Sequence, residues 1–398
     1  MAESSRLHRV AMVLASPFPA PRGTQAWIGE LSAALARSGH EVHLFCYGSG
    51  LGGVPPAGVE IHRAPLLPGV PGDLDSAPSL ARPLNDLSLL GNLLRELRNL
   101  RPSVIHGHNH EGGIAAGIAG AALGYPVVHQ IHGSLAEELV AWVDRDGSLR
   151  ARTPLGRRVA RGAGKALDYF VPRLAGRVLT LDREAVGKAG LSFSKVTVLP
   201  PGVSVPTGPL PADAPRLPRG APWVVYPGNL DPYQSLDLLM EAWPLVRREI
   251  PKARLALVTH DRGGHEMASL PGVEIVRPAS AEEARAFIES ARFVVIPRTG
   301  GGGYPLKMLN ALGLCVPVVA CRPAAKGLSE ADGVLPVEAS PLALAGGMAR
   351  LLRDETFRRS LSKNAHHFAE ENPWEKVAEA AARVYDEIAG RESASLDG

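Results

Sequence analysis

Short apolar runs alternate with longer amphipathic stretches along the first half of the chain. The apolar runs predict buried strands, and the stretches between them carry apolar residues at helical spacing. One such stretch places Ile28, Leu31, Ala34 and Leu35 on a single face and ends at Gly39. The predicted strands cover residues 10–15, 42–45, 59–62, 104–106, 126–131, 177–181 and 196–199, with further helices over 84–100 and 114–123.

The same pattern restarts in the second half, after a stretch dense in proline and glycine at residues 200–215. Its predicted strands cover 223–226, 254–258, 273–276, 293–296 and 316–320, and its helices 236–248, 281–290, 305–313 and 374–389. The tail from Arg391 is polar, and we expect it to fray. Strands that alternate with helices predict an α/β fold with parallel sheets, in which ligands bind at the carboxyl ends of the strands. The proline-rich linker predicts that the first domain ends near residue 205.

A glycine run follows one of the predicted strands of the second half. Residues 300–303 are all glycine, and Pro305 suits the first turn of the helix that follows. Glycines let a backbone approach a ligand closely, and a helix N-terminus favours an anion. This stretch predicts a diphosphate cradle, with a flexible loop as the alternative.

Composition and charge narrow the class of protein. The chain has 398 residues, of which 45% are hydrophobic and 21% charged, with a net charge of +3. This balance is typical of a globular protein and does not indicate nucleic-acid binding. Three separate cysteines, without metal or disulfide spacing, fit a cytoplasmic protein.

Five histidines gather around two predicted strand ends: His106, His108, His110, His129 and His132. Imidazole is a common metal ligand, but no carboxylate or cysteine stands at a recognisable ligand spacing, so we expect no metal. We expect His108 and His132 to form a polar site at the carboxyl edge of the sheet. His106 and His129 fit ordinary strand positions.

Residues 149–177 form a basic amphipathic segment. They contain eight Lys or Arg residues and one acid, Asp168, interleaved with apolar residues. Such a segment can lie on an anionic membrane surface, here the inner face, or it can be a solvated helix face.

Taken together, the motifs resemble the family 4 glycosyltransferases, which have the GT-B fold. The similarity lies in the following segments: Gly23 with residues 30–42, and residues 104–108, 127–133, 198–203, 228–235, 303–311 and 317–319.

The resemblance implies two Rossmann-like domains with parallel sheets that face each other across a cleft. Residues 1–205 would bind the acceptor, residues 206–375 the nucleotide-sugar donor, and residues 376–398 would form a helix that crosses back, followed by the polar tail. The resemblance also implies sugar transfer with retention of configuration and without an obligatory metal or other cofactor. Gly23 matches a position at the donor diphosphate and His132 one near the reacting sugar, while His108 is expected on the acceptor side.

The donor-binding residues depart from the family pattern. An Arg and a Lys that usually hold the diphosphate correspond to Asn229 and Gln234, and two Glu that usually bind the sugar and the ribose correspond to Gly302 and Asn310. Charge-assisted hydrogen bonds are about twice as strong as neutral ones, so these changes weaken phosphate binding unless another cation compensates.

A lysine in the same motif is the candidate replacement. Lys307 precedes Asn310 by three residues and shares its helix face. The alternative for Lys307 is an ordinary surface lysine. We also assign Gly303 and Tyr304 to donor binding, through backbone amides near the phosphates.

Three functions remain open from the sequence. The first is a glycosyltransferase acting on a glycan or lipid-linked acceptor in cell-envelope polysaccharide or glycolipid synthesis, with His132 and Lys307 as catalytic residues. The second is an inactive relative that serves as a binding or scaffold partner of another transferase, motivated by the four neutral donor positions. The third is a different GT-B enzyme, such as a sugar-nucleotide epimerase or a phosphorylase. A phosphorylase of the cofactor-bearing kind needs a Schiff-base lysine, and nothing in the sequence marks one.

Overall fold

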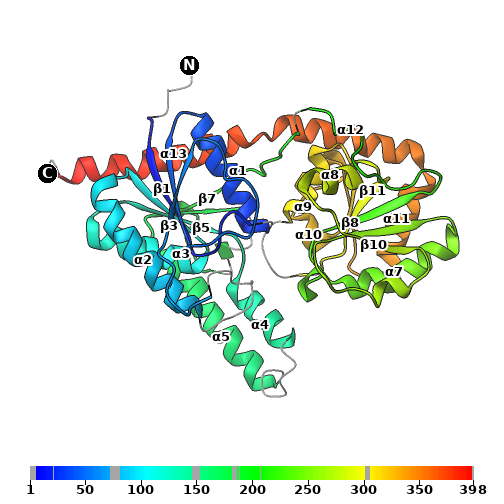
Figure 1. Ribbon diagram of the computed structural model, residues 1–398, viewed down its shortest axis with the longest axis horizontal. Coiled ribbons are helices and arrows are strands. Elements are labelled where there is room, and N and C mark those ends of the chain that lie inside the picture. The colour runs from blue at the N-terminus through cyan, green and yellow to red at the C-terminus, as the bar shows by residue number, and fades with distance from the viewer. Residues whose placement is uncertain are drawn as a thin grey trace. The chain divides into compact units, whose positions relative to one another are not determined.

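The computed structural model describes residues 6–20, 22–71, 81–145, 153–181, 186–187, 189–206, 208–300 and 305–396. The chain divides into two compact units (Figure 1). One unit contains residues 1–202 and 374–398, and the other contains residues 203–300 and 305–373. The units are called the N-terminal and the C-terminal unit below.

The described part of the N-terminal unit contains a seven-stranded parallel sheet in the order β3-β2-β1-β4-β5-β6-β7. Its strands are β1 (Arg9–Leu14), β2 (Glu41–Cys46), β3 (Val59–Arg63), β4 (Val104–His108), β5 (Val127–Ile131), β6 (Arg177–Thr180) and β7 (Val196–Val198). Its helices are α1 (Gly23–Arg37), α2 (Ala81–Leu100), α3 (Asn109–Leu123), α4 (Leu135–Arg145), α5 (Pro154–Phe170) and α13 (Trp374–Leu396).

Helices cover both faces of this sheet. Leu89 and Leu93 of α2 pack with Ala116 of α3 against Val13. On the other face, α1 packs against α13, where the rings of Trp27 and Trp374 lie 4.4 Å apart. Because both faces are covered, β1 is apolar at every position from Val10 to Leu14, all of them fully buried.

The described part of the C-terminal unit contains a six-stranded parallel sheet in the order β10-β9-β8-β11-β12-β13. Its strands are β8 (Trp223–Pro227), β9 (Arg254–Val258), β10 (Val273–Val276), β11 (Phe293–Ile296), β12 (Val318–Cys321) and β13 (Val334–Val337). Its helices are α7 (Leu236–Glu249), α8 (Ala281–Glu289), α9 (Leu306–Gly313), α10 (Arg322–Ala325), α11 (Pro341–Arg353) and α12 (Glu355–Glu371).

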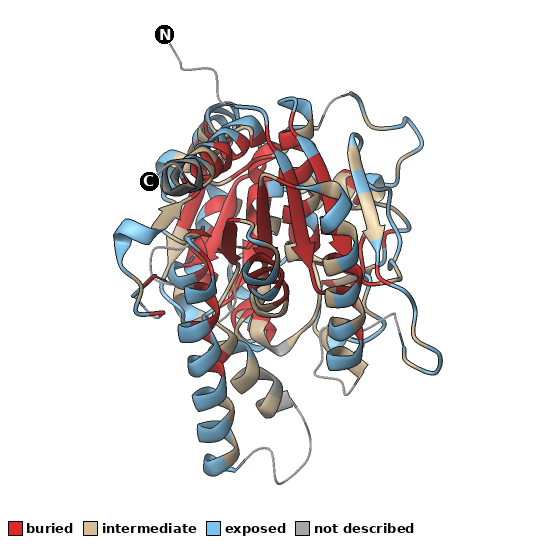
Figure 2. Cartoon of the chain, turned by 90° about the vertical axis from the view of Figure 1, so that its left-hand side faces the viewer, coloured by how far each residue is buried: buried red, intermediate tan, exposed pale blue. Residues whose placement is uncertain are grey.

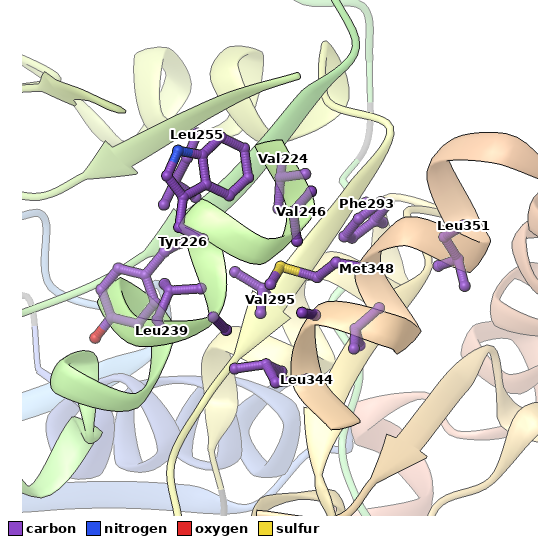
Figure 3. Close-up of a cluster of buried hydrophobic side chains, with 14 of the residues drawn as sticks. Val224, Tyr226, Leu239, Val246, Leu255, Phe293, Val295, Leu344, Met348 and Leu351 are labelled. Atoms are coloured by element: carbon purple, nitrogen blue, oxygen red, sulfur yellow. The ribbon is translucent and has the colours of Figure 1, made fainter. Parts of the chain in front are cut away.

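The core of the C-terminal unit lies between its sheet and the helices α7 and α11. Leu239 of α7 and Met348 of α11 meet Val224, Phe293 and other strand residues there (Figure 3). Side-chain hydrogen bonds cap the N-termini of several surrounding helices. Ser280 caps α8, Asp354 caps α12, and Ser340 caps α11 just before Pro341.

The structure confirms two α/β units with parallel sheets, and it corrects several predicted boundaries. Helix α3 begins at Asn109 rather than at 114, because Gly112 and Gly113 are packing positions and not loop residues. A Cβ on Gly112 would lie 2.6 Å from the carbonyl oxygen of Val13, and one on Gly113 would lie 2.4 Å from Nδ1 of His129.

Further differences concern helix and strand ends. Pro305 is the N-cap of α9 rather than a residue of its first turn. Strand β12 begins at Val318, and α13 continues to Leu396, through the tail that was expected to fray from Arg391. The elements α4, α10, β13, α11 and α12 were not predicted.

Candidate functional site

Three predicted donor residues of the C-terminal unit form a hydrogen-bonded chain at the carboxyl end of β8. Lys307 Nζ donates to Gln234 Oε1 at 2.8 Å, and Gln234 Nε2 donates to Asn229 Oδ1 at 2.7 Å. Gln234 is buried and ends the turn that follows β8, while Lys307 lies in the first turn of α9. The structure therefore brings together Asn229 and Gln234, from the segment after β8, and Lys307, from the start of α9.

Tyr226 and Gly228 hold the ammonium group of Lys307 in place. Lys307 Nζ donates to the Tyr226 hydroxyl at 2.9 Å and lies 4.3 Å from the centre of its ring. Gly228 has a φ of +127°, and a Cβ there would lie 2.7 Å from Nζ. The side chain of Lys307 is thus packed and partly buried, so Lys307 is not an ordinary surface lysine, which was the alternative left open by the sequence.

The remaining hydrogen-bonding capacity differs between Lys307 and Asn229. Asn229 Nδ2 donates to Asp231 Oδ2 at 2.6 Å and to the Tyr233 hydroxyl at 3.1 Å, and its Oδ1 accepts from Gln234. Its amide therefore fixes the turn. An ammonium group has three N–H donors, and the described residues use two of those on Lys307, which leaves one for a ligand.

Arg298 is a buried cation that the sequence interpretation did not single out. It follows β11, the neighbour of β8 in the sheet, and only 6% of it is exposed. The loops after β8 and β11 are joined where Ser235 Oγ and Thr299 Oγ1 lie 2.9 Å apart. A basic residue two positions after a buried strand, at the carboxyl edge of a parallel sheet, was the available signal.

Burial and Arg298 both act on Lys307. Removal from water lowers the pKa of Lys307 well below its usual value, and the charge of Arg298 lowers it further. Asp231 opposes this shift with a smaller effect. An anion bound here would favour the charged form of Lys307.

Four predicted donor positions lie around the start of α9. Gly302, Gly303 and Tyr304 are outside the described residues. Asn310 is exposed on α9, and the N-cap Pro305 makes no side-chain capping hydrogen bond.

Gly23 is the first residue of α1 in the N-terminal unit. Gln25 Nε2 donates to Ser16 Oγ at 2.5 Å, which ties the first turn of α1 to the loop after β1. The N-cap Arg22 makes no side-chain capping hydrogen bond, and a Cβ on Gly23 would meet no atom within 4 Å. The glycine leaves open space beside the backbone at a helix N-terminus.

His108 and His132 lie together at the carboxyl ends of β4 and β5, as predicted. His108 is the last residue of β4, and its Nδ1 lies 3.2 Å from Nε2 of His132, which follows β5. Burial lowers the pKa of His132 to about 3, helped by His110, and lowers the pKa of His108 well below the usual range. Both rings are neutral at pH 7 and act as hydrogen-bonding groups.

The other histidines have separate roles. His106 and His129 are buried in β4 and β5, and His106 Nδ1 lies 2.8 Å from the Tyr385 hydroxyl of α13. His110 Nε2 lies 2.8 Å from Asp168. Within the described residues, these five histidines do not come together as a group able to hold a metal ion.

Asp168, the one acid of the basic segment, caps α4. It accepts hydrogen bonds from Ser134 Oγ and from the backbone N–H groups of Leu135 and Ala136. Burial alone would raise its pKa, but the hydrogen bond from His110 and those from Leu135 and Ser134 lower it overall. Asp168 therefore joins α5 to α4 and to the histidine group.

The described part of the basic segment, from residue 153, is mainly the exposed helix α5 (Figure 2). Only Gly164 and Asp168 of α5 are buried, whereas Leu155 is 70% and Phe170 63% exposed. Residues 149–152 are outside the described residues. No described helix has the length and apolar character needed to cross a membrane.

Two family models match the chain. The model of Glycosyltransferase Family 4 matches residues 21–207, and that of Glycosyl transferases group 1 matches residues 221–354. The chain belongs to the family 4 glycosyltransferases.

Relatives of this glycosyltransferase match nearly its whole length. It is 27% identical over 427 residues to the D-inositol 3-phosphate glycosyltransferase of Thermobispora bispora, covering 98% of this chain and 97% of the relative. It is 24% identical over 399 residues to the phosphatidyl-myo-inositol mannosyltransferase of Mycobacterium tuberculosis, covering 96% and 97%.

Solved structures share its GT-B fold. Sucrose-phosphate synthase from Thermosynechococcus elongatus superposes with a TM-score of 0.74 at 18% identity, covering 97% of this chain and all of the other. HepE from Anabaena in complex with UDP superposes with a TM-score of 0.65 at 14% identity, covering 96% of this chain and all of HepE.

Proposed function

We propose that this family 4 glycosyltransferase transfers a sugar from a nucleoside-diphosphate sugar to a hydroxyl of a glycan or lipid-linked acceptor, with retention of configuration. The observation that carries the proposal is the hydrogen-bonded chain from Lys307 through Gln234 to Asn229. Asn229 and Gln234, two of the four positions at which the resemblance leads us to expect charges, form one ordered group, and Lys307 adds a cation to it.

Lys307 and Arg298 together supply the positive charge for the donor diphosphate. Lys307 keeps one N–H donor for a phosphate oxygen, and Arg298 contributes charge from the neighbouring loop. Charge that develops on the departing diphosphate is stabilised by such preorganised donors. The N-terminus of α9 adds amide donors.

His132 orients the sugar as a neutral imidazole. Its pKa of about 3 means that it donates or accepts a hydrogen bond at pH 7 without carrying a charge. His108, 3.2 Å away, fixes the orientation of the ring from the acceptor side. No metal ion or other cofactor takes part in this proposal.

The acceptor class is proposed from the relatives. The two relatives are named for inositol phosphate and phosphatidylinositol acceptors. A polyol phosphate, free or lipid-linked, is therefore the first acceptor to test, in the setting of cell-envelope glycolipid or polysaccharide synthesis.

The proposed location is the cytoplasmic face of a membrane, reached through α5. Leu155, Val159 and Phe170 are exposed along one side of this helix, and Arg157 and Arg161 are exposed on its other side. Such a surface binds anionic lipid with a strong salt dependence. Sedimentation with anionic but not with neutral vesicles would support this contact, and equal sedimentation with both would contradict electrostatic attachment.

The function is tested by donor consumption and sugar transfer over a panel of sugar nucleotides, with inositol phosphates and phosphatidylinositol as acceptors. Lys307→Met and His132→Ala should each lower the rate more than tenfold, whereas Lys252→Met, at an exposed lysine of the same unit, should not. Transfer at the normal rate in both variants would contradict the assigned roles. No turnover of any donor by the unaltered protein would instead support a scaffold partner of another transferase.

A further inference from the structure

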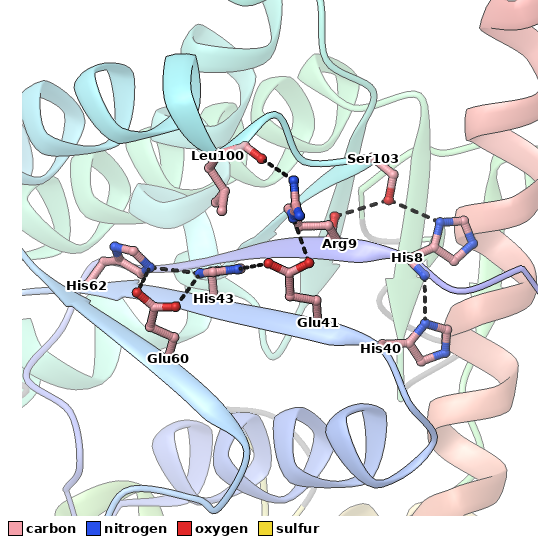
Figure 4. A network of polar contacts seen from close by, with 9 residues as sticks. All are labelled: His8, Arg9, His40, Glu41, His43, Glu60, His62, Leu100 and Ser103. Atoms are coloured by element: carbon pink, nitrogen blue, oxygen red, sulfur yellow. Dashed lines mark hydrogen bonds and ion pairs between the residues drawn. The ribbon is translucent and has the colours of Figure 1, made fainter.

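A second group of chemically distinctive side chains lies on the edge of the N-terminal sheet, outside the proposed donor residues. It contains His43 of β2 with Glu60 and His62 of the edge strand β3 (Figure 4). In the parallel register, His43 pairs with Glu60. His62 is two residues further along β3, so Glu60 and His62 project from the same face of the sheet.

The distances between the three side chains match the geometry of a tetrahedral metal centre. His43 Nδ1 lies 2.9 Å from His62 Nε2 and 3.4 Å from a Glu60 oxygen, and His62 Nε2 lies 3.5 Å from the other Glu60 oxygen. With metal–ligand bonds of about 2.0–2.1 Å, neighbouring ligand atoms of a tetrahedron are about 3.3 Å apart. The three donors therefore need only small shifts to bind one ion.

The carboxylate of Glu41 fixes the tautomer of His43, so that the bare ring nitrogen of His43 faces Glu60 and His62. His43 Nε2 lies 3.0 Å from Glu41 Oε1, and a carboxylate accepts, so this nitrogen carries the hydrogen. Arg9 in turn donates to the other Glu41 oxygen at 2.7 Å. A histidine that ligates a metal almost always donates its other N–H to such a partner, because this orients the ring and makes the ligand more basic.

The second imidazole is also held in place. The His62 ring stacks on Phe45, with ring centres 4.5 Å apart and planes 16° apart. In the arrangement described, His62 Nε2 donates to His43 Nδ1. Metal binding requires only that His62 move its hydrogen to Nδ1, so that both facing nitrogens are bare.

We propose that His43, Glu60 and His62 bind one divalent transition-metal ion, with zinc as the best match, and that water completes the coordination. Two imidazoles and one carboxylate suit zinc, whereas magnesium and calcium prefer oxygen ligands throughout. The ion would join the edge strand β3 to β2 through ligands from both strands. It lies outside the sugar-transfer chemistry, so the proposal stands or falls independently of the proposed function.

The test measures metal binding by the full-length chain without a histidine tag, after removal of metal with a chelator. Zinc is titrated against a chromophoric chelator, and cobalt is added separately, because its absorption spectrum reports tetrahedral coordination. We expect one ion per chain, tetrahedral cobalt, and a rise in the unfolding temperature with zinc.

Three variants separate this site from adventitious binding. Glu60→Gln and His62→Gln should each weaken zinc binding at least tenfold, and Glu60 is exposed, so its replacement leaves the fold intact. Glu370→Gln is the matched control, because His366 and Glu370 form an exposed pair, 3.5 Å apart, on α12. Absence of binding, equal binding by Glu60→Gln and the unaltered chain, or loss of binding in Glu370→Gln would overturn the proposal.

Discussion

Lys307 Nζ donates a hydrogen bond to Gln234 Oε1 at 2.8 Å. Seventy-three positions separate the two residues in the chain. The pair joins the turn after β8 to the first turn of α9. The family resemblance predicts a diphosphate-binding cation at the position of Gln234, and Lys307 reaches this position from α9.

Replacement of Lys307 by methionine tests this compensation. Methionine keeps most of the side-chain volume but removes the charge and the N–H donors, so affinity for a nucleoside diphosphate should fall at least tenfold. Calorimetric titration measures the change, with Lys252→Met as the control at an exposed position. Unchanged affinity in Lys307→Met would show that Lys307 does not contact the phosphates.

Binding of the diphosphate should also take up protons. Burial and Arg298 lower the pKa of Lys307 in the free protein, and a bound anion raises it again. Over the pH range between these two pKa values the complex holds more protons than the free protein, so affinity should fall as the pH rises. Titrations in two buffers of different ionisation enthalpy measure the uptake, which should disappear in Lys307→Met. Equal uptake in that variant would assign the proton to another group.

Lowering the pH should reduce the free energy of unfolding of the N-terminal unit by more than the protonation of one histidine can account for. Burial lowers the pKa values of His106 and His132 to about 3 and those of His108 and His129 well below 6.5. Unfolding exposes these rings, which then bind protons below pH 6.5, so stability is lost as the pH falls through that value. Between pH 7.5 and pH 5.5, each such histidine costs about 1.4 kcal/mol.

Urea denaturation at the two pH values measures this loss. Between the two pH values, His129→Gln should lose about 1.4 kcal/mol less stability than the unaltered chain, which is the contribution of one histidine. Equal stability at pH 7.5 and 5.5 would contradict the described burial of the group.

Replacement of Gly23 by alanine should affect donor binding without affecting stability. The added Cβ meets no atom within 4 Å, so the unfolding temperature should stay the same or rise slightly. The methyl group would occupy the space beside the helix N-terminus, so the KM for the donor should rise roughly tenfold. Gly91→Ala, at an exposed glycine of α2 that is equally free of neighbours, is the control. The same KM in Gly23→Ala and Gly91→Ala would remove Gly23 from the donor site.

The hydrophobic pattern was sufficient to predict every described strand of the two sheets except β13. Strands such as Phe293–Ile296 and Val318–Cys321 are buried at every position, so they read as continuous apolar runs bounded by turn residues. Glycine was harder to interpret. Gly112 and Gly113 suggested a loop, although they lie inside α3, where the close approach of Val13 and His129 excludes a side chain.

The site was predictable where neighbouring strand ends carry its residues. His108 ends β4 and His132 follows β5, and these adjacent parallel strands end at the same edge of the sheet. The hydrogen bond between His110 and Asp168 joins residues 58 positions apart in the chain. It depends on how α5 packs against α4, and a local sequence pattern does not predict such packing. The buried charge of Arg298 depends likewise on the fold of its surroundings.

A working donor site is tested by thermal unfolding against UDP, GDP, ADP, dTDP and CMP, each at millimolar concentration and without added metal. A ligand that binds only the folded state stabilises it by RT ln(1 + [L]/Kd), about 2.7 kcal/mol at a hundredfold excess over Kd. We expect a clear rise in the unfolding temperature with one nucleoside diphosphate, and loss of that rise in Lys307→Met. No rise with any of the five nucleotides would contradict a working donor site.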